Sequence, residues 1–131
     1  MLFFKLIMIV MISGSRSIKE LSTSAITSLN KIIELEFKVI IGDAPGVDVQ
    51  VQQYLQSQTY QNVTVYYAMF NGNGKPRNTN GFNVVGVLGN YVNRDKQMCK
   101  IANYGLAIWD GKSQGTAANI LRVQRTKVIF A

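Results

Sequence analysis

The chain has 131 residues, of which 47% are hydrophobic and only 2 are proline, and this composition indicates one globular domain. Lys and Arg number 14 against 7 Asp and Glu, so the net charge is +7, which favours anionic partners such as nucleotides or nucleic acid. No histidine is present, which excludes Ser-His and Cys-His nucleophilic schemes and nearly every zinc site, so we expect no bound metal. The single cysteine, Cys99, excludes an internal disulfide and is predicted to be a structural thiol in a cytoplasmic protein.

The first twelve residues, MLFFKLIMIVMI, are apolar enough to be compared with a signal peptide or a membrane anchor. Lys5 interrupts this run, which is far shorter than the roughly 20 residues that a spanning helix needs. The Gly-Ser-Arg-Ser that follows does not match a small-x-small cleavage site. We therefore expect a buried strand here and no membrane partner.

Runs of Ile and Val alternate with longer mixed segments, which predicts parallel strands separated by helices. In chain order we expect a strand at 6–13, a helix at 18–33 with Ser17 as its N-cap, a strand at 37–41, a helix at 47–57, a strand at 63–67, a helix at 92–103, a strand at 105–109, a helix at 116–125 and a strand at 127–130. The Gly- and Asn-rich segment 68–90 is predicted as a long loop in which Val84 to Leu88 form a short strand or an apolar anchor. The predicted fold is α/β: one Rossmann-like, doubly wound domain with a mainly parallel five-stranded sheet and helices on both faces.

Three of the predicted strand-to-helix turns carry glycine beside small or hydroxyl residues. In an open parallel sheet, ligands bind beyond the carboxyl ends of the strands, near the point where the strand order reverses. Backbone N–H groups, the helix dipole and hydroxyl groups can cradle an anion there. The turn residues that we expect to contact a phosphate-bearing ligand are Gly14, Ser15, Arg16, Gly42, Asp43, Ala44, Gly46, Gly111, Lys112, Ser113, Gly115 and Thr116.

Two familiar motifs do not fit the third of these turns. Gly111-Lys112-Ser113 ends like a P-loop, but the residues between Gly105 and Gly111 belong to the predicted strand, so no loop remains to wrap a phosphate. Residues 111–115 also match the G-x-S-x-G nucleophile elbow, yet a chain without histidine cannot form the usual hydrolase triad. Neither motif therefore defines the site.

Other charged residues near these turns leave alternatives open. Arg94, at the start of a predicted helix, can direct its guanidinium at a phosphate or can pair locally with Asp95. Asp43 can hydrogen-bond a ribose, whereas Asp48 is most simply an early helix residue that complements the helix dipole. Residues 76–78 in the long loop can close over a ligand or stay exposed.

Several aromatic residues offer stacking faces for bases, although such side chains more often cover a core. They are Tyr54, Tyr60, Tyr66, Tyr67 and Phe70.

Taken together, these residues resemble the SLOG superfamily of Rossmann-like domains, which includes LOG-type nucleotide phosphoribohydrolases and the DNA-processing protein of natural transformation. The resemblance covers nearly the whole chain. The pattern of motifs is similar to that of the small stand-alone bacterial members. Its motifs are ISGSR at 12–16, GDAPGVD at 42–48, RDKQM at 94–98 and DGKSQGT at 110–116. The resemblance implies a nucleotide-type ligand at the glycine turns.

In LOG-type enzymes, an Arg on a helix and a Glu three positions after a Gly-Thr pair serve the cleavage of an N-glycosidic bond. The resemblance places that Arg at Arg94 and that Glu at Asn119. An amide can neither accept the proton nor carry the negative charge that steadies an oxocarbenium-like centre. The departure at Asn119 therefore implies ligand binding more than LOG-type catalysis.

The leading hypothesis is a nucleotide-binding or nucleotide-derivative-binding protein that requires no further cofactor. The first alternative is a nucleotide N-glycosidase, phosphoribohydrolase or nucleotide-sugar hydrolase, with Asp43, Asp110 and Arg94 as catalytic candidates. The second alternative is single-stranded DNA binding, which the charge of +7 and the resemblance to the DNA-processing protein suggest. A homodimer is compatible with a sheet that stops at a short final strand.

Overall fold

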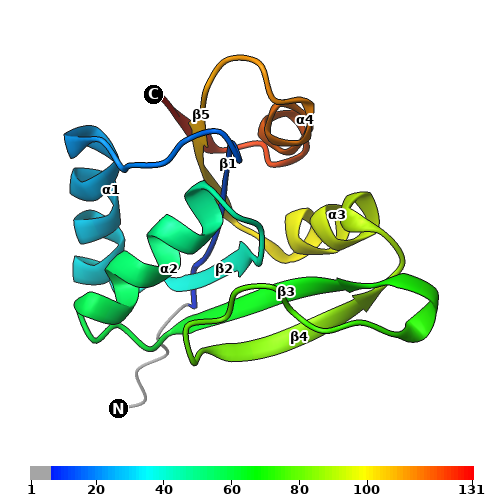
Figure 1. Ribbon diagram of the computed structural model, residues 1–131. Coiled ribbons are helices and arrows are strands. Elements are labelled where there is room, and N and C mark those ends of the chain that lie inside the picture. The colour runs from blue at the N-terminus through cyan, green and yellow to red at the C-terminus, as the bar shows by residue number, and fades with distance from the viewer. Residues whose placement is uncertain (1–6) are drawn as a thin grey trace, which may run out of the picture.

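The computed structural model describes residues 7–131, so residues 1–6, where the first predicted strand begins, lie outside the described residues. The chain forms one six-stranded sheet in the order β4-β3-β2-β1-β5-β6, and every neighbouring pair of strands is parallel (Figure 1). The prediction of a Rossmann-like α/β fold is confirmed at the level of a parallel sheet with helices, but the predicted number of five strands is wrong. Within residues 7–131, no helix has the length and apolar character needed to cross a membrane.

Most of the predicted elements are present with small shifts at their ends. The strands are β1 (Ile9–Gly14), β2 (Lys38–Gly42), β3 (Val63–Met69), β4 (Asn83–Leu88), β5 (Tyr104–Trp109) and β6 (Thr126–Phe130). The helices are α1 (Thr23–Glu34), α2 (Val47–Ser57), α3 (Tyr91–Ile101) and α4 (Gln114–Arg122), and a short 3₁₀ turn, η1, covers Phe70–Gly72.

The additional strand is β4, which lies inside the segment predicted as a loop and confirms the first of the two alternatives for Val84 to Leu88, a short strand. It pairs with β3 along its whole length, from Thr64 opposite Asn83 to Met69 opposite Leu88. Two features left this strand undecided in the sequence. Its apolar run, VVGVL, is short and interrupted by Gly86, and the connection from β3 contains no α-helix. The alternation of strands and helices, which revealed the other strands, is therefore broken here.

The first helix starts later than predicted because a different serine caps it. The hydroxyl of Ser22 accepts a hydrogen bond from the Ala25 amide at 3.2 Å, so α1 begins at Thr23. Ser17, the predicted cap, instead donates to Asp110 at 2.7 Å. The stretch between them crosses the end of the sheet and buries Ile18 in the core.

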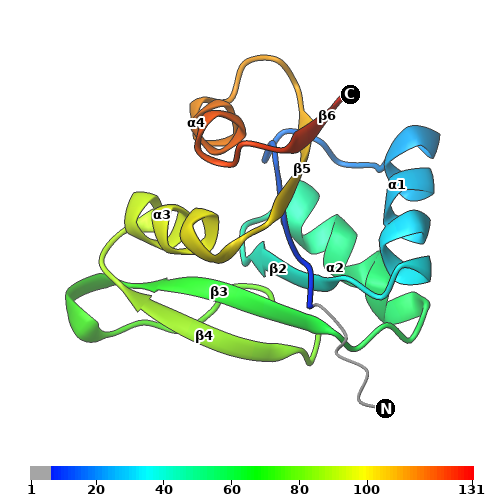
Figure 2. The same cartoon turned by 180° about the vertical axis from the view of Figure 1, so that it is seen from behind.

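Helices cover the sheet in two layers (Figure 2), and side chains along each strand alternate between its two faces. Val10 and Ile12 of β1 belong to the larger core cluster, which includes residues of α1 and α2. Met11, between them, belongs to a smaller cluster with Met98 of α3. The helices thus lie on both faces, as expected for a doubly wound sheet.

The strand order reverses between β1 and β5. From β1 the chain adds β2, β3 and β4 on one side, and α3 then returns it to β5 on the other side of β1. The carboxyl ends of β1 and β5 therefore lie side by side, with Gly14 opposite Ile108. In open parallel sheets this position is where ligands bind.

Candidate functional site

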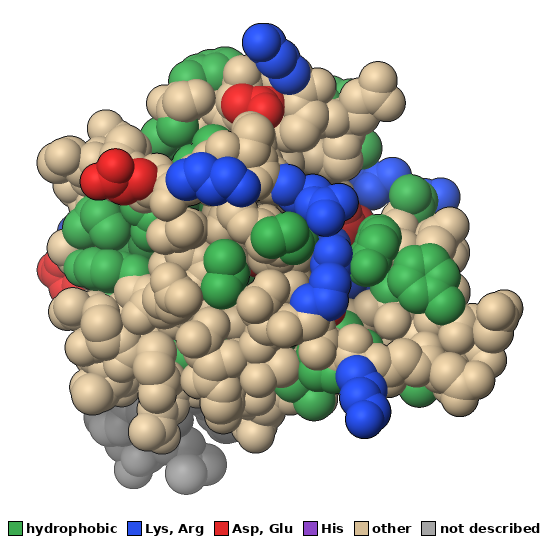
Figure 3. All heavy atoms as spheres, viewed as in Figure 1, with side chains coloured by type: hydrophobic (Ala, Val, Ile, Leu, Met, Phe, Trp, Pro, Cys, Tyr) green, Lys and Arg blue, Asp and Glu red, His purple; other side chains and the backbone are tan. Residues whose placement is uncertain are grey.

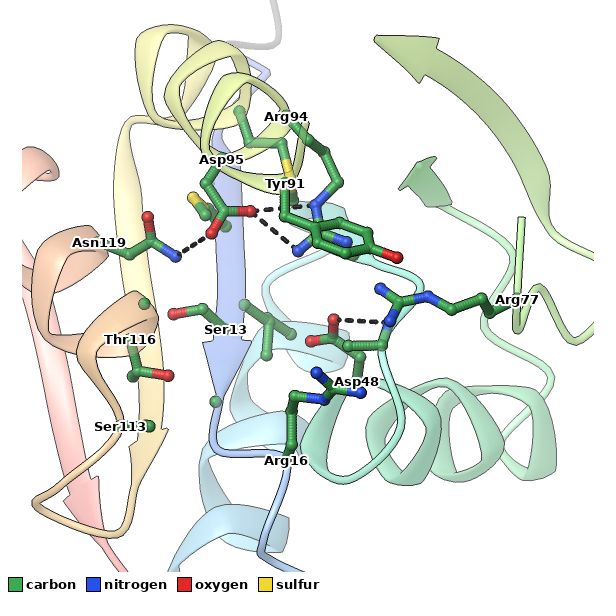
Figure 4. A pocket seen from close by; sticks show the side chains of 17 residues that line it. Ser13, Arg16, Asp48, Arg77, Tyr91, Arg94, Asp95, Ser113, Thr116 and Asn119 are labelled. Carbon is green, nitrogen blue, oxygen red and sulfur yellow. Dashed lines mark hydrogen bonds and ion pairs between the residues drawn. The ribbon is translucent and has the colours of Figure 1, made fainter. Parts of the chain in front are cut away.

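A cavity of about 220 Å³ opens at the carboxyl ends of β1 and β5 (Figure 4). The predicted site residues that line it are Gly14, Arg16, Gly42, Ala44, Arg94, Ser113, Gly115 and Thr116. The remaining lining residues are Met11, Ile12, Ser13, Asp48, Arg77, Tyr91, Asp95, Met98 and Asn119. Five predicted site residues do not line the cavity, namely Ser15, Asp43, Gly46, Gly111 and Lys112. All three predicted turns therefore contribute residues to one cavity, as expected. The five residues outside its lining belong to the same turns.

Two of the glycines are required by packing. A Cβ at Gly14 would lie 2.4 Å from Cγ1 of Val47, so Gly14 lets the end of β1 approach the first turn of α2. Gly46 has a φ of +83°, and a Cβ there would lie 2.5 Å from the backbone of Arg16. Gly46 therefore holds the second turn against the first, although it does not face the cavity.

The amino terminus of α4 carries unsatisfied backbone donors at the cavity. Ser113 is its N-cap residue, but its side chain makes no capping hydrogen bond and no acidic residue lies in the first turn. The Ser113 hydroxyl instead shares a hydrogen bond with the Ser15 hydroxyl at 2.8 Å. The next residues, Gly115 and Thr116, line the cavity, and a Cβ at Gly115 would meet nothing within 4 Å. The positive end of the helix dipole therefore faces open space.

Asp110 fixes the turn that leads into α4. Its Oδ1 accepts the amides of Ser113 and Lys112, both at 2.8 Å, and its Oδ2 accepts the hydroxyl of Ser17 at 2.7 Å. The Asp110 amide in turn donates to the Ser15 hydroxyl at 2.9 Å. The hydrogen bond from the Ser113 amide, followed by that from Ser17, lowers the pKa of Asp110 well below its usual range. Asp110 is therefore a structural carboxylate, unsuited to act as an acid.

Asp43 binds two arginines and does not reach the cavity. Its side chain is 2% exposed, and its Oδ1 accepts Nη1 of Arg94 at 2.8 Å and Nη2 of Arg77 at 2.9 Å. Its Oδ2 accepts the Arg77 amide at 2.8 Å. Burial raises the pKa of Asp43, but the hydrogen bonds from Arg77 outweigh it and bring the pKa below the ordinary value. With both oxygens occupied, Asp43 positions the arginines and has no free oxygen for a ribose.

The connection between β3 and β4 is tied down over the start of α2. The Asn78 side chain donates to the Asp43 carbonyl at 3.0 Å, and the buried Gln52 donates to the Asn78 carbonyl at 3.1 Å. Asn80 donates to Gln52 Oε1 at 2.9 Å. Of the two alternatives for residues 76–78, these bonds favour a segment closed over the site, and they carry Arg77 to the cavity.

Tyr91 presents an aromatic ring at the cavity, which no aromatic residue singled out from the sequence does. The guanidinium of Arg77 lies 4.4 Å from the centre of this ring, and that of Arg94 lies 5.2 Å from it. Tyr54 and Tyr60 pack against the larger core and Tyr66 belongs to the smaller one. Tyr91 went unnoticed because it begins α3, where the sequence pattern marks only a helix start.

Arg94, Asp95 and Asn119 form one chain of contacts along the cavity (Figure 4). Arg94 donates through Nε to Asp95 Oδ1 at 3.0 Å, and Asn119 donates through Nδ2 to Asp95 Oδ2 at 3.0 Å. The side-chain oxygen of Asn119, Oδ1, accepts a hydrogen bond from Nη1 of Arg122 at 3.1 Å and another from the Cys99 thiol at 3.6 Å. Burial, the largest cause, raises the pKa of Cys99 to about 11, so the thiol is protonated and inert at neutral pH.

Asp48, which the sequence predicted only as a partner of the helix dipole, is a buried carboxyl at the cavity. Its side chain accepts the Ala44 amide at 3.1 Å and the residue is 5% exposed. Burial raises the pKa of Asp48 to about 7, against the opposing charge of Arg94. Helical spacing could have revealed this placement, because Asp48 shares the buried face of α2 with Val51 and Leu55.

No known protein family, curated protein or solved structure matches the chain. The fold and the cavity alone therefore define its class: an all-parallel, Rossmann-like α/β domain with a polar cavity where the strand order reverses. Across residues 7–131, no group of three or more Cys, Asp or Glu side chains is placed to hold a metal ion.

Proposed function

We propose that this protein binds a nucleotide or a nucleotide derivative in the cavity at the ends of β1 and β5. The observation that carries the proposal is the uncapped amino terminus of α4, which meets the cavity at Gly115 and Thr116. Free backbone amides and a positive helix end make a phosphate site that needs no charged side chain. The resemblance to SLOG domains implies the same class of ligand.

The arrangement of charge supports a phosphate on the side of α4 and Arg16. Basic side chains gather near the middle of the face shown in Figure 3. Arg94 is engaged by Asp43 and Asp95, and Arg77 is engaged by Asp43. Arg16 lines the cavity and forms no side-chain ion pair with the residues that the structure describes. Arg16 is therefore the cation best able to pair with a bound phosphate.

The part of the cavity next to α3 suits the sugar and the base. Asp95 of α3 lines it (Figure 4), and a carboxylate accepts hydrogen bonds from sugar hydroxyls while it repels phosphate. Tyr91, which is 39% exposed, lies beside the Arg77 and Arg94 guanidiniums, and a base can pack against this aromatic and cationic surface. A nucleotide is thereby oriented with its phosphate at α4 and its sugar toward α3.

Hydrolysis of a nucleotide is the second candidate function, and Asp48 is the residue that favours it. Neither acid first considered, Asp43 or Asp110, lines the cavity. Asp48 does, and with a pKa of about 7 it can donate a proton to a leaving group at neutral pH. Chromatography of nucleotides incubated with the wild-type protein or with Asp48→Asn tests this candidate function. Release of free base by the wild type, and none by Asp48→Asn, supports it. The second alternative, single-stranded DNA binding, stays a prediction.

Ligand binding is tested by a panel of AMP, ADP-ribose, NAD and cyclic nucleotides. A ligand that binds only the folded state at about 100 times its Kd stabilises the protein by about 2.7 kcal/mol, which is visible as a rise in melting temperature. Arg16→Ala is expected to weaken the effect, whereas Lys100→Ala, an equal loss of charge at an exposed site outside the cavity, is expected to leave it unchanged. No rise with any ligand at millimolar concentration contradicts the proposal.

A further inference from the structure

A second cavity, of about 230 Å³, lies at the opposite end of the sheet. It is bounded by α1 and by the amino-terminal ends of β1, β5 and β6, whereas the nucleotide cavity lies at the carboxyl ends. Its lining residues are Val10, Ser28, Lys31, Ile32, Leu35, Phe37, Tyr104, Gly105, Leu106, Arg125 and Lys127. None of them lines the first cavity, so the two are separate sites.

The interior of this second cavity is apolar. Val10, Ile32 and Leu106 belong to the larger core cluster and form part of its wall. Phe37 and Tyr104 stack with their ring centres 5.7 Å apart and their planes 7° from parallel. Such a wall favours an apolar ligand body, because transfer of apolar surface out of water is the main driving force for binding here.

One polar atom in this wall has no partner. Ser28 is 7% exposed, and its hydroxyl is the only buried side-chain oxygen or nitrogen in residues 7–131 without a hydrogen bond. Buried hydroxyls are nearly always paired, so an orphan at a cavity wall indicates a missing partner. A ligand with a polar group would supply it.

The rim of the cavity is positive. Lys31, Arg125 and Lys127 line it, and each is exposed. Lys31 pairs with Glu34 at 3.7 Å, while Arg125 and Lys127 form no ion pair within the described part of the chain. Two uncompensated cations beside an apolar wall favour a ligand that carries a negative charge at one end.

From these observations we propose that the second cavity binds a small carboxylate with an apolar body, such as a medium-chain fatty acid. The chain lies against Leu106 and the Phe37–Tyr104 pair, and the carboxylate pairs with Arg125 and Lys127. The carboxylate, which is the only hydrogen-bond acceptor of such a ligand, also accepts the Ser28 hydroxyl. This site does not depend on the nucleotide cavity, so either proposal can fail without the other.

The test is an NMR titration of the ¹⁵N-labelled full chain with octanoate. Saturable shifts are expected for the amides of Ser28, Gly105 and Lys127, and they are expected to persist in the presence of AMP. Because hydrogen bonds to charged groups contribute about 1.5–3 kcal/mol, 1-octanol is expected to bind about tenfold more weakly or worse. Shifts at Gly14 and Gly115 in place of these, or equal affinity for octanol, would overturn the proposal.

Matched variants separate charge from packing. Lys127→Glu is expected to weaken octanoate binding about tenfold, whereas Lys100→Glu on α3, with the same change in charge, is expected to have no effect. Ser28→Ala is expected to weaken binding without lowering the melting temperature, because it removes a hydroxyl that has no partner in the protein. Unchanged affinity in both Lys127→Glu and Ser28→Ala contradicts the proposed contacts.

Discussion

The replacement Asp48→Asn tests whether the carboxyl group at the cavity is neutral in the folded protein. Asparagine keeps the size of the side chain and an oxygen that can accept the Ala44 amide, but it does not titrate. Any difference in pH dependence between the two proteins therefore reports the ionisation of Asp48. The neighbouring Arg94, Asp43 and Asp95 are present in both proteins, so their contributions largely cancel.

The sign of the effect follows from the direction of the pKa shift. Burial raises the pKa of Asp48 from 3.8 to about 7 in the folded state. Between these values the unfolded chain has lost the proton while the folded protein still holds it, so the stability of the wild type falls as the pH rises. Each pKa unit corresponds to about 1.4 kcal/mol, which gives a loss of up to about 4 kcal/mol relative to Asp48→Asn by pH 8.

Urea unfolding at half-unit steps from pH 4 to pH 8 measures this difference. The difference in free energy of unfolding is expected to move in favour of Asp48→Asn from pH 4 upward, to reach its full slope of about 1.4 kcal/mol per pH unit between about pH 5 and pH 6, and to flatten as the pH rises past 7. Glu20→Gln, which removes an exposed carboxylate outside the cavity, serves as the control. A difference that moves in favour of the wild type with rising pH would show that Asp48 is ionised and paired with Arg94, and it would refute the argument.

Four further replacements test three separate parts of the structure. Gly115→Ala adds a methyl group where nothing lies within 4 Å, so calorimetry is expected to show weaker nucleotide binding with the melting temperature unchanged or higher; unchanged affinity argues against a ligand at α4. Asp43→Asn leaves Arg77 and Arg94 without their shared carboxylate and is expected to lower the free energy of unfolding in urea by about 3 kcal/mol at pH 7. This difference is expected to shrink as the pH falls below 3.8. A loss of less than about 1 kcal/mol contradicts the buried network. Ser22→Ala removes the α1 cap and is expected to lower the free energy of unfolding by about 1 kcal/mol, whereas Ser17→Ala is expected to leave α1 intact. A loss of helix content by circular dichroism in Ser17→Ala, and none in Ser22→Ala, would show that Ser17 is the cap.

The sequence by itself determined the parallel sheet and the edge at which the site lies. Runs such as VMI in β1 and VII in β2 are buried on both faces, which only a parallel sheet covered by two helical layers provides. The glycine turns after β1 and β5 converge because the carboxyl ends of parallel strands share one edge. The strand β4 stayed one of two alternatives for Val84 to Leu88, because its apolar run is short and interrupted by Gly86 and its connection to β3 has no helical period to mark it.

Only the tertiary structure decided which polar residues face the cavity. Asp43 looked available for a ribose, yet Arg94, separated from it by 51 positions, and Arg77, by 34, occupy its oxygens. Asp48 looked like a simple helix-dipole partner, yet its burial at the cavity raises its pKa to about 7. Local pattern fixes which residues lie at the ends of the strands. The direction of each side chain and its state of ionisation depend on partners that only folding brings within reach, because desolvation and ion pairing act over distances of a few ångströms in space and not along the chain.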